Sequence, residues 1–401
     1  MTRAKGIVIA IIVVLVIGVL AVGGSYLVAK SKHNKAAEEL SRGKDLLENG
    51  KEKAAISVFK DYIAEYSDMP GAPEAMFLLA KTLRKQNPES REAKAMFDKI
   101  LKQYPDSAFA RQARYYKAMS LVKDTPFDEQ TRSFFRNLAE EDAENPQAAY
   151  VAQYGLALAD LQAGRLDKAK TRLDDLLESA IPDELRNRVE NTLGDLNLRL
   201  LYSPEITGDD EYYTIKRGDY IYELARKFDV TQELLMECNR ISDPRRIREG
   251  QRIKIPNVDF SILVDRYDNT LTLLANGKFF KEYPVRTGKY EGQTPTGEFE
   301  IIHKKKDPEW TDPITNKKYP SGHPENELGT RWMAFRGSML GIHGTIKPET
   351  VGLYSSQGCV GMYKEDVEEL YKLVPTGTPI RITGEMNPQI VQKSKAMGYR
   401  D

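Results

Sequence analysis

Cysteine is nearly absent from this chain of 401 residues, which contains only Cys238 and Cys359. Two thiols are too few for a disulfide framework or for a zinc site built from paired thiolates. The four histidines are scattered, so we expect no metal and no other cofactor. Excess charge is absent as well, because 59 basic residues balance 59 acidic ones. This balance argues against nucleic acid as a partner.

A long run without any charge lies near the N-terminus. Residues 6–29 are apolar or glycine except for Ser25 and Tyr26, and residues 1–5 form a short tail predicted to be cytoplasmic. A helix needs about 20 apolar residues to cross a bilayer, whereas a cleavable signal peptide has an apolar region of about 7 to 15. We therefore predict an uncleaved single-pass anchor. Basic residues flank it on both sides, so the charge rule leaves its orientation open.

Residues 36–201 lack β-rich runs and place apolar residues at helical spacing. A pattern of aromatic and alanine positions returns after thirty-eight residues: Phe59, Tyr66, Ala75 and Ala80 recur as Phe97, Tyr104, Ala113 and Ala118. This pattern resembles tetratricopeptide-type helical repeats, which stack into a shared core with a concave face. Two roles stay open for it, a surface that binds a protein partner and a rigid stalk that recognises nothing.

Residues 202–211 are acidic and rich in turn formers, which predicts a linker. Residues 212–256 then show a strand, two short helical stripes and a closing strand, and Cys238 in the second stripe is expected to be buried. This βααβ segment resembles a LysM module. The resemblance implies that it binds glycan strands containing N-acetylglucosamine, through Gly218, Asp219, Tyr220, Asn239 and Ile241.

Residues 260–383 change to short strands separated by glycine and proline, which predicts a mainly-β domain followed by a tail at residues 384–401. His343 stands there in the run Gly-Ile-His-Gly-Thr, and Cys359 in the run Ser-Gln-Gly-Cys-Val-Gly-Met. An imidazolium beside a thiol lowers the thiol pKa and yields a nucleophilic thiolate, so we predict that the two side chains meet. Gly358 permits a tight turn from which amide N–H groups can face an oxyanion.

These two runs, with Thr-Pro-Thr-Gly at residues 294–297 and Leu-Gly-Thr-Arg-Trp at residues 328–332, resemble the signature of the L,D-transpeptidase catalytic domain. The resemblance implies that Cys359 attacks the third residue of a peptidoglycan stem tetrapeptide, releases D-alanine and forms a thioester, which an amine or water resolves. It implies His343 as the base, oriented by the backbone carbonyl of Gly344. It also implies an oxyanion and active-site loop at Ser356, Gln357 and Gly358, and substrate contacts from Arg331, Trp332 and His323.

One position departs from that family, whose members commonly carry arginine two residues after the cysteine, where this chain has Gly361. Arg331 or a lysine near the site is a candidate substitute for it. The modules together predict a membrane-anchored peptidoglycan L,D-transpeptidase with its C-terminal domains on the cell-wall side, acting on stem peptides and glycan strands. The alternatives are a peptidoglycan-binding tether that has lost activity through Gly361 and a scaffold in the cytoplasm.

Overall fold

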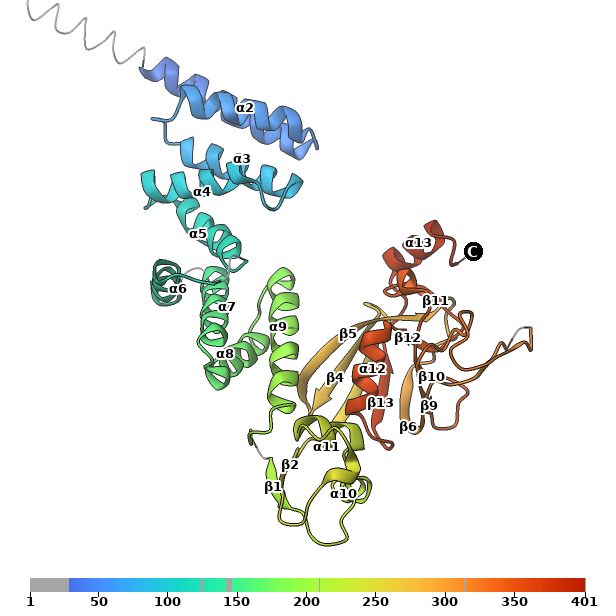
Figure 1. Cartoon of the computed structure of the whole chain (residues 1–401). Helices are drawn as coiled ribbons and strands as arrows, with labels where there is room; N and C mark the ends of the chain where they lie inside the picture. Colours follow the sequence, from blue (N-terminus) through green and yellow to red (C-terminus); the bar gives the residue numbers. More distant parts are fainter. Residues whose placement is uncertain (1–28, 124–125, 142–145, 209, 314, 401) are drawn as a thin grey trace, which may run out of the picture. The chain divides into compact units, whose positions relative to one another are not determined.

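The computed structural model describes residues 29–123, 126–141, 146–208, 210–313 and 315–400 (Figure 1). The predicted anchor at residues 6–29 therefore lies, except for Ala29, outside the described residues. Across the described ranges, no helix has both the length and the apolar character that crossing a membrane requires. The chain divides into two compact units, residues 1–172 with 179–182, and residues 173–178 with 183–401.

The first unit is built from helices, as the apolar spacing predicts. The described part of residues 36–201 contains helices and turns but no strand. After a helix that covers residues 29–48, the chain forms α2 (Glu52–Glu65), α3 (Ala72–Gln86), α4 (Arg91–Gln103), α5 (Ala108–Leu121), α6 (Glu129–Glu141), α7 (Pro146–Gln162) and α8 (Leu166–Glu178).

The thirty-eight-residue pattern corresponds to two successive helix pairs. Phe59 on α2 and Phe97 on α4 are buried at equivalent positions, and the alanines Ala75 on α3 and Ala113 on α5 are fully buried beside them. The Phe97 ring stacks on Tyr116 with centroids 5.0 Å apart. Each pair thus contributes aromatic and small side chains to the core, which is the packing that a helical repeat needs.

The second unit contains the end of α8 (residues 173–178), then α9 (Asp183–Leu201) and the small module that follows it. The module consists of β1 (Glu211–Thr214), α10 (Ile221–Lys227), α11 (Gln232–Cys238), the 3-10 helix η1 (Pro244–Arg246) and β2 (Arg252–Ile255). β1 and β2 pair antiparallel, and the two α-helices lie between them in sequence. The 3-10 helix before β2 is an element that the sequence pattern did not predict.

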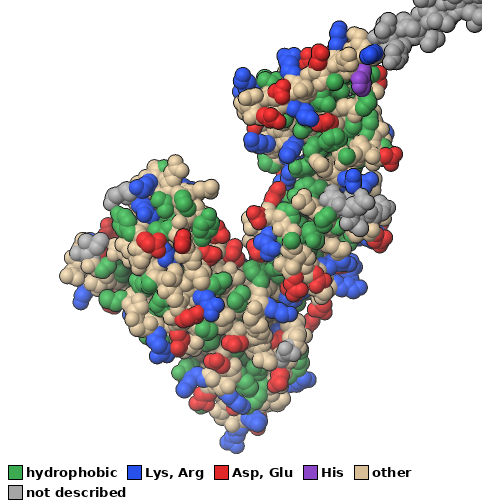
Figure 2. All heavy atoms as spheres, turned by 180° about the vertical axis from the view of Figure 1, so that it is seen from behind, with side chains coloured by type: hydrophobic (Ala, Val, Ile, Leu, Met, Phe, Trp, Pro, Cys, Tyr) green, Lys and Arg blue, Asp and Glu red, His purple; other side chains and the backbone are tan. Residues whose placement is uncertain are grey.

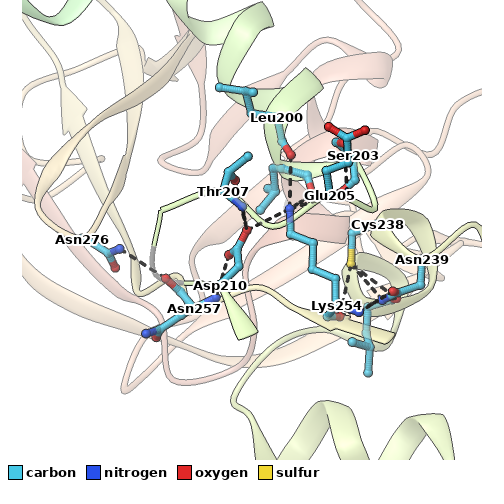
Figure 3. Close-up of polar contacts among 12 residues, drawn as sticks. Leu200, Ser203, Glu205, Thr207, Asp210, Cys238, Asn239, Lys254, Asn257 and Asn276 are labelled. Atoms are coloured by element: carbon cyan, nitrogen blue, oxygen red, sulfur yellow. Dashed lines mark hydrogen bonds and ion pairs between the residues drawn. The ribbon is translucent and has the colours of Figure 1, made fainter. Parts of the chain in front are cut away.

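Lys254 on β2 fastens this module to the end of α9. Its side chain is fully buried, and its ammonium forms an ion pair with Asp210 at 2.9 Å (Figure 3). The ammonium also donates hydrogen bonds of 3.1 to 3.4 Å to the backbone carbonyls of Leu200, Leu201 and Ser203. A cation at this place is favoured by the partial negative charge at the C-terminal end of a helix. The predicted linker is therefore tied to β2 at Asp210.

The C-terminal domain is a closed sheet. Its strands are β3 (Phe260–Asp265), β4 (Thr270–Ala275), β5 (Lys278–Gly288), β6 (Gly297–Lys306), β9 (Arg331–Phe335), β10 (Gly341–Gly344), β11 (Tyr354–Ser356), β12 (Val360–Met362) and β13 (Pro379–Thr383). They run in the order β11-β5-β12-β10-β9-β6-β13-β3-β4, and β4 also pairs with β5. This last pairing closes the sheet into a barrel.

Short elements surround the barrel, namely the hairpin of β7 (Trp310–Thr311) and β8 (Lys318–Tyr319), the 3-10 helix η2 (Pro348–Thr350), α12 (Lys364–Leu373) and α13 (Pro388–Ala396). The predicted tail is thus partly helical. The N–H of Tyr354 donates to the Ser394 hydroxyl of α13 at 3.0 Å. This bond ties the tail to β11, the strand that leads to Cys359.

One hydrophobic cluster runs through α9, the small module and the barrel. α11 lies against α12, where Lys372 pairs with Glu237 at 2.7 Å and the Thr231 hydroxyl donates to the Lys372 carbonyl. α9 donates from Asn197 to the Phe280 carbonyl of β5 at 2.9 Å. On the face drawn in Figure 2, acidic and basic side chains are mixed over the described residues. The second unit is therefore held together by a shared core and by specific polar contacts.

Candidate active site

Neighbouring strands carry the predicted catalytic residues. β12 pairs with β10 on one side and with β5 on the other, and β10 also pairs with β9. This register places Arg286, Gly361, His343 and Trp332 in one row across β5, β12, β10 and β9. Directly paired residues of a pleated sheet share a face, so the side chains of this row lie on one side of the sheet. Cys359 precedes β12 and stands two residues before Gly361.

The loop that carries Cys359 is fixed by side chains on both sides of the cysteine. The Ser356 hydroxyl accepts from the N–H of Gly358 at 3.1 Å and donates to the carbonyl of Cys359 at 2.7 Å. The Thr294 hydroxyl donates to the carbonyl of Gly358 at 2.7 Å. The N–H of Gly358 is thus taken up within the loop, and the oxyanion role of Ser356, Gln357 and Gly358 stays a prediction.

Gly358 is required at its position for two reasons. Its φ of +126° is a conformation that side chains disfavour. A Cβ there would also lie 2.4 Å from the carbonyl oxygen of Gln293, far inside a normal contact. The backbone before the cysteine is therefore packed directly against the loop that precedes β6, and Gln357 beside it is exposed.

His343 is only 4% exposed on β10. Its Nδ1 lies 2.5 Å from the backbone carbonyl oxygen of Gly344, the contact expected of that residue. Because a carbonyl can only accept, Nδ1 carries the proton and Nε2 keeps its lone pair. Burial lowers the pKa of His343 to about 4, and the positive charge of Arg286 acts in the same direction. The ring is therefore neutral at neutral pH and available as a base.

The thiol of Cys359 is partly exposed, and burial raises its pKa above the ordinary value. A hydrogen bond from the backbone of Gly341 and the charge of Arg286 oppose that rise. The low pKa of His343 favours a neutral imidazole, whereas an imidazolium was expected beside the thiol. Both groups are therefore uncharged at neutral pH.

Two charged residues of this site were not predicted from the sequence. Arg286 is 3% exposed, and its Nη2 lies 3.8 Å from the Glu327 carboxylate while its Nη1 donates to the Thr350 hydroxyl at 3.4 Å. The Glu327 loop is held at Gly329, whose added Cβ would lie 3.2 Å from the carbonyl carbon of Gly344. No local motif marks either Arg286 or Glu327, since each reaches the site through the pairing of distant segments.

Comparison with known proteins identifies the barrel. Residues 259–382 match the family model of the L,D-transpeptidase catalytic domain. The YkuD protein of Bacillus subtilis (strain 168) is 34% identical over 176 residues, a match that covers 42% of this chain and 97% of that protein. The chain belongs to the L,D-transpeptidase family. The YkuD protein of Bacillus licheniformis is 32% identical over 177 residues, a match that covers 43% of this chain and 98% of that protein.

The accessory parts of this L,D-transpeptidase family member match families of their own. Residues 213–256 match a LysM domain and residues 74–107 a tetratricopeptide repeat. Among solved structures, the catalytic domain of the E. faecium L,D-transpeptidase is 26% identical with a TM-score of 0.26, covering 31% of this chain and 97% of that chain. An L,D-transpeptidase from Mycobacterium smegmatis is 18% identical with a TM-score of 0.27, covering 33% of this chain and 63% of that chain.

The residues predicted to contact substrate divide between two faces of the transpeptidase barrel. The Trp332 ring lies 6.0 Å from the His343 ring, centroid to centroid, on the face of the catalytic row. Arg331 is adjacent to it in the strand and points to the opposite face, where its guanidinium lies 3.7 Å from Glu368 and over the Tyr371 ring of α12. Arg331 therefore does not replace the missing arginine, because successive residues of a strand alternate between faces.

His323 belongs to the loop after the β7–β8 hairpin. Its ring packs on Tyr319 at 5.2 Å, and Tyr319 stacks on Trp310 at 5.2 Å. The Nδ1 atom of His323 accepts from the N–H of Glu325 at 3.1 Å. These contacts give His323 a structural place in the loop.

The LysM residues have similarly divided surroundings. Asn239 is bound to its own module, since its side chain bonds both the N–H and the carbonyl of Lys254, at 2.6 and 2.8 Å (Figure 3). The Asp219 carboxylate accepts from the N–H of Lys216 at 2.7 Å and shapes the turn at Gly218. Ile241 packs against the core. Tyr220, the aromatic residue among the predicted glycan contacts, has 65% of its surface exposed.

Cys238 is fully buried, and burial raises its pKa to about 12. Its Sγ donates to the Leu235 carbonyl at 3.5 Å inside the LysM domain (Figure 3). This environment matches the predicted role as a small buried side chain and leaves Cys359 as the accessible thiol of the pair. Among the residues that the structure describes, no cluster of three histidine, cysteine or acidic side chains could hold a metal ion.

Proposed function

We propose that this protein is a peptidoglycan L,D-transpeptidase in which Cys359 is the nucleophile and His343 is the base. The observation that carries the proposal is the row across β12 and β10, which brings a neutral imidazole to the strand that follows the fixed cysteine loop. The adjoining LysM domain supports peptidoglycan as the polymer that is bound.

In the proposed first half-reaction, the sulfur of Cys359 attacks the carbonyl carbon of the third residue in a stem tetrapeptide. The thiol proton passes to Nε2 of His343, a C–S bond forms and the carbonyl oxygen becomes an oxyanion. When the oxyanion collapses, the bond to the terminal D-alanine breaks, and Nε2 returns the proton to the departing amine. The peptide stays on the enzyme as a thioester.

In the proposed second half-reaction, an acceptor amine attacks the thioester and an amide bond forms as the C–S bond breaks. The proton lost by the amine passes through His343 to the sulfur, which restores the thiol. A diamino acid of a neighbouring stem as acceptor gives a 3→3 cross-link, and a protein lysine gives attachment of that protein to the wall. Water as acceptor gives a tripeptide, which is carboxypeptidase activity.

The other parts of the chain would place this chemistry at the wall. The charge-free run at residues 6–29 supports a membrane anchor, and the polymerised substrate requires the C-terminal domains to face the cell wall. Tyr220 and the turn at Gly218 would contact glycan. The tetratricopeptide match supports a protein partner for the helical unit.

Intact-mass spectrometry of the full chain with a stem tetrapeptide tests the proposal. We expect an acyl adduct on Cys359 together with released D-alanine, neither of which Cys359→Ala should give. Cys238→Ala is the matched control and should retain both, because Cys238 is buried away from solvent. D-alanine release by Cys359→Ala would refute the mechanism. A parent protein that forms no adduct with the tetrapeptide or a carbapenem would be the inactive tether.

A further inference from the structure

Gly361 leaves room for the side chain of Arg286 on the neighbouring strand. Its φ lies outside the left-handed region, so its backbone conformation is open to other residues. A Cβ at Gly361 would nevertheless lie 2.5 Å from Nε and 2.7 Å from Cγ of Arg286, its partner on β5. The Arg286 side chain therefore occupies the space above Gly361 and extends over β12, toward the row position of His343 on β10.

The guanidinium of Arg286 is buried with few partners. Its Nε has no hydrogen-bond partner among the described residues, and its two contacts, to Glu327 and to Thr350, are long at 3.8 and 3.4 Å. Arginine keeps its charge in proteins, and a buried charge without close partners is costly. A guanidinium held in this way has donors left for a negative charge that forms next to it during a reaction.

The charges around the pair come from several elements. Besides burial, the positive charge of Arg286 on β5 lowers the pKa of both Cys359 and His343. The negative charge of Glu327, in the loop before β9, raises the pKa of Arg286 and of His343. Glu349 of η2 likewise raises the pKa of Arg286. Among these groups, Arg286 is the positive one. Its charge favours the thiolate form of Cys359 and the neutral form of His343.

We propose that Arg286 is a positioning residue of the reaction, whose guanidinium crosses Gly361 from the neighbouring strand and supplies the positive charge for Cys359 and His343. This inference rests on the proposed function for its biological meaning. The chain thus carries this arginine on β5 and has glycine at the position paired with it on β12. The two positions form one functional pair although residues 286 and 361 are far apart in sequence.

The rate at which iodoacetamide alkylates Cys359 between pH 6 and pH 11.5, followed by the intact mass of the full chain, tests this proposal without any wall substrate. Cys238 is buried and does not contribute. The thiolate is the reacting form, so loss of the guanidinium in Arg286→Gln should move the midpoint upward by about one pH unit, which is about tenfold slower alkylation at pH 7. Arg286→Lys should lie between the parent and Arg286→Gln.

The decisive variant transposes the arginine. Gly361→Arg alone should be destabilised, because its side chain collides with Arg286. In the double variant Arg286→Ser with Gly361→Arg, serine on β5 frees the space above position 361, and the new arginine on β12 supplies a guanidinium there. The double variant should therefore recover most of the tenfold loss in alkylation rate. The matched control is Arg381→Gln, which removes an exposed arginine of the same barrel paired with Glu298, and should titrate like the parent.

The outcomes separate the two proposals. A folded Arg286→Gln with the parent's profile, or a double variant that alkylates no faster than Arg286→Ser, would overturn the role of Arg286. The second comparison decides the matter if Arg286→Gln fails to fold. A purely structural arginine would change the unfolding temperature and leave the alkylation midpoint in place. If the midpoint moves as expected but the parent releases no D-alanine, the role of Arg286 stands and the proposed transpeptidation falls.

Discussion

Substitution of Gly358 by alanine should separate two costs that glycine avoids in the cysteine loop. The first is conformational, because holding a residue with a side chain at a φ of +126° costs about 1–3 kcal/mol. The second is steric, because the new Cβ would lie 2.4 Å from the Gln293 carbonyl oxygen, and carbon atoms keep contacts of about 3.5 Å or more. The loop therefore has to shift by about 1 Å, and a shift of that size costs about 100-fold in rate.

Gly352→Ala is the matched control for this prediction. Gly352 has a φ of +82°, but an added Cβ meets nothing within 4 Å, so that only the conformational cost applies. At about 2–4 °C per kcal/mol for a unit of this size, Gly352→Ala should lower the calorimetric Tm by a few degrees and Gly358→Ala by clearly more. D-alanine release from a stem tetrapeptide should fall only in Gly358→Ala. A rate for Gly358→Ala within about tenfold of the parent's would refute the reasoning.

Three further predictions concern other parts of the second unit. Lys254→Met should lower the free energy of unfolding in urea by about 3–5 kcal/mol, because it leaves the buried carboxylate of Asp210 without its ion-pair partner. Lys372→Met removes an exposed ion pair and should cost about 1 kcal/mol or less. Equal effects of the two substitutions would contradict a stabilising role for the buried Lys254–Asp210 pair. Tyr220→Ala should reduce co-sedimentation with insoluble peptidoglycan and leave the Tm unchanged, because the ring is exposed. Asn239→Ala should lower the Tm, because it removes hydrogen bonds within the module. The opposite result would make Asn239 the glycan contact and Tyr220 the structural residue. The folded pKa of His343, about 4, lies below its ordinary 6.5, so the unfolded state binds more protons between these values, and stability should fall by on the order of 3 kcal/mol as the pH drops through that window. His343→Gln should lack this loss, and an equal pH dependence in both proteins would argue against a buried neutral ring.

The modules could be predicted from the sequence because their signals are local, and the pairing of His343 with Cys359 as a reactive couple stays a prediction. Helical spacing, strand alternation and the runs around His343 and Cys359 each lie within a short window. The faces of β9 could not be predicted, because adjacent residues alternate in direction and only the register decides that Trp332 and not Arg331 joins the catalytic row. Asn239 was predicted to contact glycan from the resemblance to a LysM module, and its hydrogen bonds to the backbone of Lys254 on β2 are visible only in the structure.

Protonation was the other property that the sequence could not reveal. An imidazolium was expected beside the thiol because histidine and cysteine often form an ion pair, but the charge of a ring depends on its burial, and His343 is almost inaccessible. The cation that does act on Cys359 comes from Arg286, whose relation to the site exists only once β5 and β12 pair.

The tie between Lys254 and the end of α9 bears on how tension would pass through the molecule. The ammonium joins three carbonyls at the end of the helix to the last strand of the LysM domain, and the next residues lead directly into β3. A force applied along α9 would therefore be transmitted to the barrel through the buried contacts of Lys254, and the linker at residues 202–211 would not first have to be extended. Under the proposed function, a LysM domain that holds glycan and the sulfur of Cys359 would therefore move together.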